Sequence, residues 1–135
     1  MSKRRRAWPY LYASKAINRG DKVLVRFPIT TAAAQSSANP IPGGAVVTRR
    51  WLEITTPYSA GTTITLGQTG SATLLMGTAD SSPTDAVVGP DPSNVYDSHT
   101  PTQWGTSALA LLVTVAGAPA AGAGFAAAEY YLPLA

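Results

Sequence analysis

The feature that most constrains the fold is a short-range alternation of apolar and polar side chains. In the run KVLVRF, Val23, Val25 and Phe27 fall on one face of an extended chain, while Leu24 and Arg26 fall on the other. An amphipathic helix would instead repeat its apolar residues every three or four positions. The run therefore predicts a β-strand with one face towards a core.

The same alternation recurs in later runs, which are separated by turn-forming residues. These runs are WLEITT at 51–56, TITL at 63–66 and LALLVTV at 109–115. The 135 residues include 12 Gly and 11 Pro, and show no clear amphipathic helix. About six to eight short strands bounded by such turns are typical of an antiparallel sandwich or barrel. We expect one all-β domain, an antiparallel β-sandwich over residues 21–135, after an extended N-terminal arm over residues 1–20.

Two segments without this alternation are predicted to be loops. Residues 30–44, TTAAAQSSANPIPGG, are mainly small side chains with two prolines and two glycines. Residues 77–106 carry four of the seven acids, and a connection of that length in a compact domain is often functional. Within it, AVVG at 86–89 is a candidate for a short strand.

A stretch from Ser98 to Ala128 contains no formally charged residue and superficially resembles a membrane span. It is mostly Ala and Gly, is broken by Pro119, and has apolar residues that alternate as in a strand. We therefore expect two strands around the turn GAPAAG and no contact with a membrane. The positive N-terminus has no apolar stretch behind it, so we do not expect a secretory signal.

Charge is distributed very unevenly along the chain. All ten Lys and Arg lie in residues 1–50, where Asp21 is the one acid, so this part has a formal charge of +9. Residues 51–135 carry six acids and no Lys or Arg, a formal charge of −6. Such asymmetry argues for an acidic partner at one end of the molecule.

The densest cluster of this charge is the N-terminal sequence MSKRRRAWPYLY, where aromatic residues follow the cations at once. Aromatic and Arg side chains are enriched at the centres of protein interfaces. Cations also bind phosphates with counterion release, and aromatic rings stack on bases. We favour an arm that docks on a protein, with nucleic acid and a tail without a partner as alternatives. The candidate binding residues are Lys3, Arg4, Arg5, Arg6, Trp8, Tyr10 and Tyr12.

Two adjacent cations, Arg49 and Arg50, stand inside a predicted strand and are further candidates for partner binding. Neighbouring strand residues point to opposite faces, so one of the two faces the core side or an interface unless a bulge intervenes. A buried Arg needs a partner, and Glu53 lies on the same face as Arg49. Trp51 is either a core residue or an interface anchor.

The sequence offers no pattern for catalysis or for metal binding. The chain has no Cys, so its single histidine, His99, cannot form a zinc site by itself. No G-x-S-x-G elbow accompanies it for a Ser-His-Asp triad. The Asp residues of the long loop lie beside Ser, Pro or Gly, where they commonly cap turns, and they lack EF-hand spacing. We expect no catalytic residue, no cofactor and no metal, and a protein that is not an enzyme.

Two stretches within residues 22–133 carry a recognisable order of strands and turns: NPIPGGAVVTRRWLEITTPYSAGTTITLGQTGSATLLMG and SALALLVTVAGAPAAGAGFAAAEYYL. This order resembles that of the head cement or decoration proteins of tailed bacteriophages. The shared features are an IP-x-G-A-V-V segment, a T-T-x-Y/F turn, a G-T-x-x-T-x-x-V-G hairpin and a late strand pair joined by an Ala/Gly turn. The chain departs from this pattern at Arg50, where an apolar residue is expected, and in its basic arm.

The resemblance implies a jelly-roll-like sandwich on the outside of a phage capsid, where it bridges neighbouring major capsid subunits. It also implies a dimer or trimer at a capsid symmetry axis, and no chemistry. Many weak contacts repeated over a lattice resist the pressure of packaged DNA, because avidity multiplies small affinities. The arm, residues 3–12, would lie across an acidic groove of the shell and become ordered on binding.

Three other functions remain open at this point. One is a coat protein whose basic arm binds nucleic acid inside a shell. Another is the base of a head fibre or spike, which would form a trimer before it meets a capsid. The last is a carbohydrate-binding sandwich, for which Trp104 is the only obvious exposed aromatic residue.

Overall fold

The computed structural model describes residues 20–78, 83–84 and 97–133. These residues form strands and no helix, so none of them belongs to a helix that could cross a membrane. The strands are β1 Lys22–Ile29, β2 Ala34–Ile41, β3 Val46–Thr56, β4 Thr63–Gln68, β5 Ser71–Met76, β6 Asp97–Ser98, β7 Thr102–Gln103, β8 Leu109–Ala116 and β9 Ala123–Tyr131.

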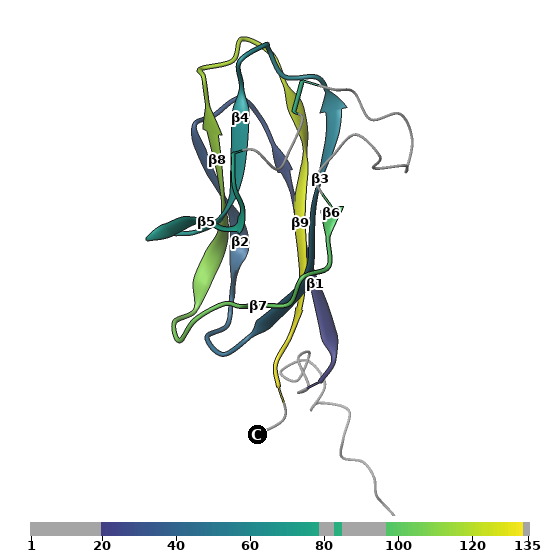
Figure 1. The fold of residues 1–135 in the computed structure, drawn as a ribbon, viewed down its shortest axis with the longest axis vertical. Helices are drawn as coiled ribbons and strands as arrows, with labels where there is room; N and C mark the ends of the chain where they lie inside the picture. Colours follow the sequence, from purple (N-terminus) through teal and green to yellow (C-terminus); the bar gives the residue numbers. More distant parts are fainter. Residues whose placement is uncertain (1–19, 79–82, 85–96, 134–135) are drawn as a thin grey trace, which may run out of the picture.

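The strands form two antiparallel sheets that face each other (Figure 1). Sheet A has the order β1-β9-β3, and both β6 and β7 pair with β3 at its other side. Sheet B has the order β2-β8-β4-β5. Counting β6 and β7 as one strand gives eight strand positions in chain order. The first then pairs with the eighth (β1 with β9) and the second with the seventh (β2 with β8). The third pairs with the sixth (β3 with β6 and β7) and the fourth with the fifth (β4 with β5). This is the order of a jelly roll, so the predicted jelly-roll-like β-sandwich is confirmed.

The core lies between the two sheets and follows the predicted alternation. Leu52 and Ile54 of β3 face it, and Val23, Val25 and Phe27 of β1 pack at its margin. Sheet B contributes a matching set from its two central strands: Ile64, Leu66, Leu111, Val113 and Val115. The face assignments made from the sequence for these strands are confirmed.

A β-bulge in β3 brings two parts of the apolar pattern onto one face. Val47 and Arg49 pair with consecutive residues of β9, so Thr48 is an extra residue in β3. Val47 and Leu52 are an odd number of positions apart, yet both are buried, which a regular strand would not allow. Arg50 lies beyond the bulge, two positions before Leu52, and so faces the core side together with Leu52.

The predicted loop at 30–44 is wrong, because residues Ala34–Ile41 form β2. Only Ser37 and Ile41 of this strand are buried. Its sequence therefore lacks the alternation of apolar and polar side chains that marks a strand with one buried face. β2 lies at the edge of sheet B and is specified by its backbone pairing with β8. An edge strand tolerates Pro40, whose nitrogen has no hydrogen to donate.

The prediction of one long loop over 77–106 is wrong where β6 and β7 form. Each is two residues long, and together they complete sheet A beside β3. Their polar residues carry no strand pattern. The candidate strand at 86–89 lies outside the described residues.

The last third of the chain forms two strands, β8 and β9, around the Ala/Gly turn, which confirms the interpretation of this stretch as strands. β8 belongs to sheet B and β9 to sheet A, so the turn crosses from one sheet to the other and does not close a hairpin. The hairpin predicted earlier in the chain is present as β4 and β5.

Candidate functional site

The binding residues predicted from the sequence fall into two groups. Seven of them, Lys3, Arg4, Arg5, Arg6, Trp8, Tyr10 and Tyr12, lie outside the described residues. The two on β3 point to opposite faces, as strand geometry requires. Arg49 is half-buried on the outer face of sheet A, whereas Arg50 faces the core side and is 2% exposed. The structure therefore does not bring these two cations together.

Two bidentate ion pairs cross the outer face of sheet A, which we call the ion-pair row. Arg26 of β1 donates to both carboxylate oxygens of Glu53 on β3, over distances of 3.0 and 2.9 Å. Arg49 donates to both oxygens of Asp97 on β6, over 3.1 and 2.9 Å. The expected partner of Arg49 was Glu53, and this is wrong, because Glu53 reaches back across β9 to Arg26.

Aromatic rings fill the spaces within the ion-pair row. The guanidinium carbon of Arg26 lies 3.9 Å from the ring centroid of Phe125, and that of Arg49 lies 4.5 Å from the ring of Trp51. The indole Nε1 of Trp51 donates to Glu53 over 2.9 Å. Trp51 is thus an outer-face residue and not part of the core, which favours the interface-anchor reading of this residue.

The fold cancels much of the charge asymmetry seen along the sequence. Early cations meet late acids across the sheet, and a looser contact of 3.8 Å between Lys22 and Glu129 adds to the two bidentate pairs. By contrast, residues 1–19 hold six of the ten Lys and Arg and no acid. By sequence, the surplus of cations over acids is therefore concentrated in residues 1–19, whereas Arg49 is committed to a carboxylate.

The ion-pair row lowers the pKa of its carboxyl groups. Hydrogen bonds from Arg26 lower the pKa of Glu53 against the opposing effect of burial, and the Trp51 indole acts in the same direction. Hydrogen bonds from Arg49 likewise lower the pKa of Asp97. A carboxyl group whose pKa is lower in the folded state stabilises the fold above its unfolded pKa, and this contribution is lost as the pH falls through the folded pKa.

We therefore expect acid to weaken the sandwich partly through these two groups. The free energy of unfolding should fall as the pH drops below the ordinary carboxyl pKa values of 4.5 and 3.8. Each pair should contribute about 0.2–1 kcal/mol, as partly exposed pairs do. Urea unfolding of the wild type and of the Glu53→Gln/Asp97→Asn variant over a pH series checks this. The variant should have the flatter acid limb, and equal slopes would contradict the assignment.

Arg50 is a buried cation without a carboxylate partner among the described residues. Its Nη2 donates to the hydroxyl of Thr102 over 2.6 Å, its Nη1 lies 3.5 Å from the hydroxyl of Ser98, and its Nε has no acceptor in this part of the chain. The partner that a buried Arg requires is thus a pair of hydroxyls on β6 and β7. Arg50 ties these two short strands to β3.

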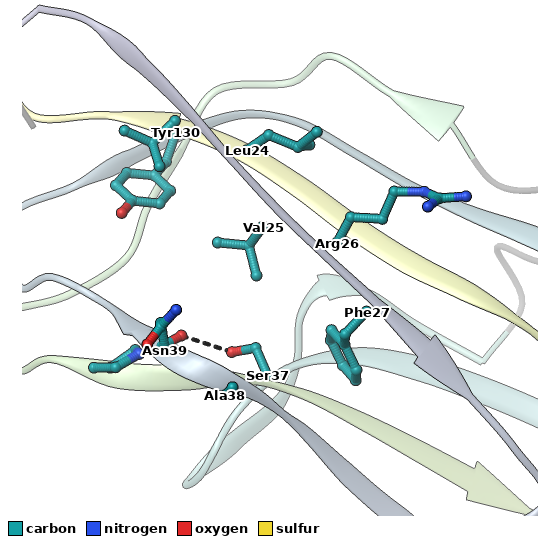
Figure 2. Close-up of a pocket in the computed structure, with 10 residues that line it drawn as sticks. Leu24, Val25, Arg26, Phe27, Ser37, Ala38, Asn39 and Tyr130 are labelled. Carbon is teal, nitrogen blue, oxygen red and sulfur yellow. Dashed lines mark hydrogen bonds between the residues drawn. The ribbon is translucent and has the colours of Figure 1, made fainter. Parts of the chain in front are cut away.

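A groove runs along the side of the sandwich where the edge strands β1 and β2 face each other (Figure 2). This β1–β2 groove has a volume of about 440 Å³ and is lined by residues 23–27, residues 37–40 and Tyr130. Val25 and Phe27 point across it towards β2, while Leu24 and Arg26 project from the other side of β1. Each edge strand pairs on one side only, β1 with β9 and β2 with β8, within the described part of the chain.

A bulge in β2 shapes one wall of the β1–β2 groove. The register of β2 against β8 shifts between Ser36 and Pro40. At this shift the hydroxyl of Ser37 accepts a hydrogen bond from the backbone nitrogen of Leu111 over 3.0 Å and donates to the carbonyl of Asn39 over 2.8 Å. The serine side chain thus replaces the backbone pairing that the bulge disrupts.

The described residues hold no arrangement suited to metal binding: no group of three or more His, Cys, Asp or Glu gathers among them. His99 is exposed between β6 and β7, which confirms its reading as a solvated loop residue. Asp97, the carboxylate closest to it in sequence, is held by Arg49. The three other Asp residues of the long loop, at 80, 85 and 91, lie outside the described residues.

Trp104 is not an exposed aromatic residue, so this expectation is wrong. Its side chain is 1% exposed and belongs to the core. Its backbone nitrogen donates to Ala45 over 2.9 Å, and its carbonyl accepts from the side chain of Gln68 over 2.6 Å. The residue that favoured a carbohydrate-binding sandwich is therefore not available to a sugar.

Comparison with known proteins relates this fold to chains of phage capsids. No family model and no curated protein matches the sequence. A chain of the cyanophage Pam1 capsid asymmetric unit is 23% identical, with 98% of this chain and 93% of that chain covered and a TM-score of 0.61. A chain of the acidic stable capsid structure of Helicobacter pylori bacteriophage KHP30 is 17% identical, with 87% and 92% covered and a TM-score of 0.62. At these identities the similarity shows a shared fold.

Proposed function

We propose that this protein is a non-enzymatic virion component that binds the outside of a phage capsid and joins neighbouring major capsid subunits. The observation that carries the proposal is the jelly roll shared with chains of two phage capsid structures. Each of those chains is matched over more than nine-tenths of its own length, so each is about as small as this one. A chain of this size is short for a jelly roll that builds a shell by itself, but it suits a component added to one.

The outer surface of the sandwich supports a role in protein contacts. Arg26, Arg49, Trp51 and Phe125 combine cations with aromatic rings on one sheet face, and such side chains are enriched at the centres of interfaces. Leu24, on the same face of β1 as Arg26, is 54% exposed. The pairs of the ion-pair row are already neutral, so this face suits a partner surface of low net charge.

The arm supplies the attraction to an acidic partner. Residues 1–19 contain six Lys and Arg and no acid, and charges at the rim of an interface speed association and make it salt-dependent. In this proposal Lys3, Arg4, Arg5 and Arg6 lie against an acidic groove of the shell. The arm gains order when it binds.

Co-sedimentation with undecorated phage heads tests the proposed function. At low salt, purified protein should pellet with the heads and reach saturation at a fixed number of copies per shell. Raising the salt should release it, because exposed charge pairs are screened. If no protein pellets with the heads at low salt, capsid binding is contradicted.

The excess of cations in the arm also favours a second candidate, a coat protein whose arm binds nucleic acid. Filter binding at several salt concentrations separates the two functions. For an arm that contacts phosphates, the logarithm of the association constant falls linearly with the logarithm of the salt concentration. The slope is about −0.9 per phosphate contacted on duplex DNA. We expect weak binding with no such steep slope, and a steep slope would favour the coat protein.

A further inference from the structure

We propose that the β1–β2 groove receives the aromatic segment Trp8–Tyr12 from the arm of a second copy of this chain. The segment would add a strand to the open edge of β1 and place its rings in the groove. The inference rests on the groove, on the course of β1 and on the sequence of the arm. It does not depend on capsid binding.

The β1–β2 groove combines an unpaired strand edge with an apolar wall. Val23, Val25 and Phe27 pack against the core from the edge of sheet A without being fully buried. The edge of β1 opposite β9 has no strand partner among the described residues. Exposed edges of this kind invite the pairing of another chain. An extended peptide that adds a strand there gains affinity from its backbone and specificity from alternate side chains.

The arm carries a segment with matching alternation. Trp8, Tyr10 and Tyr12 occupy every second position, so in an extended conformation all three rings point to the same face. An added strand lies at the edge of its sheet, and Pro9 is tolerated there when its nitrogen faces outward. Each ring can bury about 150–250 Å² and retains a polar tip, which suits a groove that is open to water.

The course of the chain at the start of β1 favours the arm of another copy. The backbone nitrogen of Gly20 donates to the carbonyl of Leu132 over 2.8 Å, so Gly20 already runs beside the end of β9. A two-residue hairpin turn at Gly20 and Asp21, a common loop length, would place residue 19 opposite Lys22 and residues 14–18 along the groove. Residues 8–12 would then reach Ile29 and beyond it, past the groove.

An arm from a neighbouring copy is not joined to this β1 by a turn, so its residues 8–12 can pair with any part of the strand. The seven residues between Tyr12 and Gly20 span at most about 25 Å when extended, roughly the length of the eight-residue β1, so the segment can reach the groove of a sandwich packed alongside. The cations at residues 3–6 would emerge beyond the groove and stay available to an acidic partner. The aromatic half of the arm would thus link copies, and the basic half would bind elsewhere.

Single-cysteine variants test the exchange, because the natural chain contains no Cys. Tyr10 is the middle ring of the segment and Val25 lies in the middle of the groove wall, so this pair tolerates either strand direction. Tyr10→Cys protein is mixed with Val25→Cys protein, oxidised without any capsid, and separated on a non-reducing gel. Tyr10→Cys with Thr73→Cys is the matched control, since Thr73 is exposed on β5 in the other sheet.

We expect the Tyr10–Val25 pair to form at least about tenfold more interchain disulfide than the control, because a bound arm raises the effective concentration of the cysteine. Equal amounts in the two mixtures would overturn the proposal. The Tyr10→Cys/Val25→Cys double variant distinguishes the source of the arm. If it forms mainly an intrachain disulfide, the groove takes the arm of its own chain, and the proposal is equally wrong.

A second measurement needs no cysteine. We expect light scattering to give the wild type a mass of two or more chains. Replacing Trp8, Tyr10 and Tyr12 by serine should shift it towards one chain without changing the unfolding transition. An unchanged mass in the variant would also overturn the proposal. Since no capsid is present in either experiment, failure of the proposed function leaves these outcomes unaffected.

Discussion

Replacing Gly124 by alanine should leave little folded protein, although only one methyl group is added. Gly124 lies in β9, between Ile29 of β1 and Ile54 of β3. A Cβ atom at this position would collide with the backbone carbonyl oxygen of Glu53. The clash is with backbone that pairs with β9, so relief requires separating the two strands with the most extensive contact in sheet A. We expect a loss of about 4 kcal/mol or more, comparable with the whole stability of a small domain.

The matched control is Gly70→Ala in the turn between β4 and β5. A Cβ atom there meets nothing within 4 Å, but the φ angle of 89° is unfavourable for alanine. The expected cost is about 1 kcal/mol from backbone strain alone. Circular dichroism and urea unfolding of both variants check the difference. A Gly124→Ala protein as stable as Gly70→Ala would mean that the close approach of β3 and β9 is not as described.

Replacing Lys3, Arg4, Arg5 and Arg6 by glutamine should weaken binding to phage heads about a hundredfold at low salt. Four exposed ion pairs at about 0.7 kcal/mol each give nearly 3 kcal/mol, and each 1.4 kcal/mol is a factor of ten. The free energy of unfolding should be unchanged, because these residues precede the sandwich. Sedimentation isotherms at low and high salt measure the loss, which should shrink as salt increases.

A matched pair of variants separates position from net charge. Arg4→Gln/Arg5→Gln and Lys15→Gln/Arg19→Gln each remove two positive charges from residues 1–19. We expect about a tenfold loss for the first and almost none for the second, because the proposed contact is with the basic block. Equal losses in both would show that only overall charge matters, and no loss in the quadruple variant would remove the arm from the interaction.

Strand positions were predictable from the sequence wherever one face of a strand meets the core and the other meets water. The alternation in β1 and β8 gave correct faces because burial itself imposes a period of two. β2 was not predicted, because its pairing with β8 depends on the backbone and on the side chain of Ser37, and neither produces an apolar pattern in the sequence. β6 and β7 were not predicted, because strands of two residues are too short to show an alternation of apolar and polar side chains.

The candidate site was less predictable, because its contacts join residues far apart in the chain. Glu53 was correctly placed on the outer face of β3, but its partner Arg26 is 27 positions away and across β9. Asp97 was expected to cap a turn, yet it holds Arg49 from a strand 48 positions away. The register of β1, β9 and β3 reveals the first pair and the pairing of β3 with β6 reveals the second, and a sequence alone gives neither.

Electron cryo-microscopy of phage heads with and without this protein tests the central claim most directly. The account predicts additional density of sandwich size on the outer surface, at contacts between neighbouring shell subunits and at a fixed occupancy. Density for this chain within the wall of the shell, or on its inner surface beside the genome, would contradict a component that joins capsid subunits from outside.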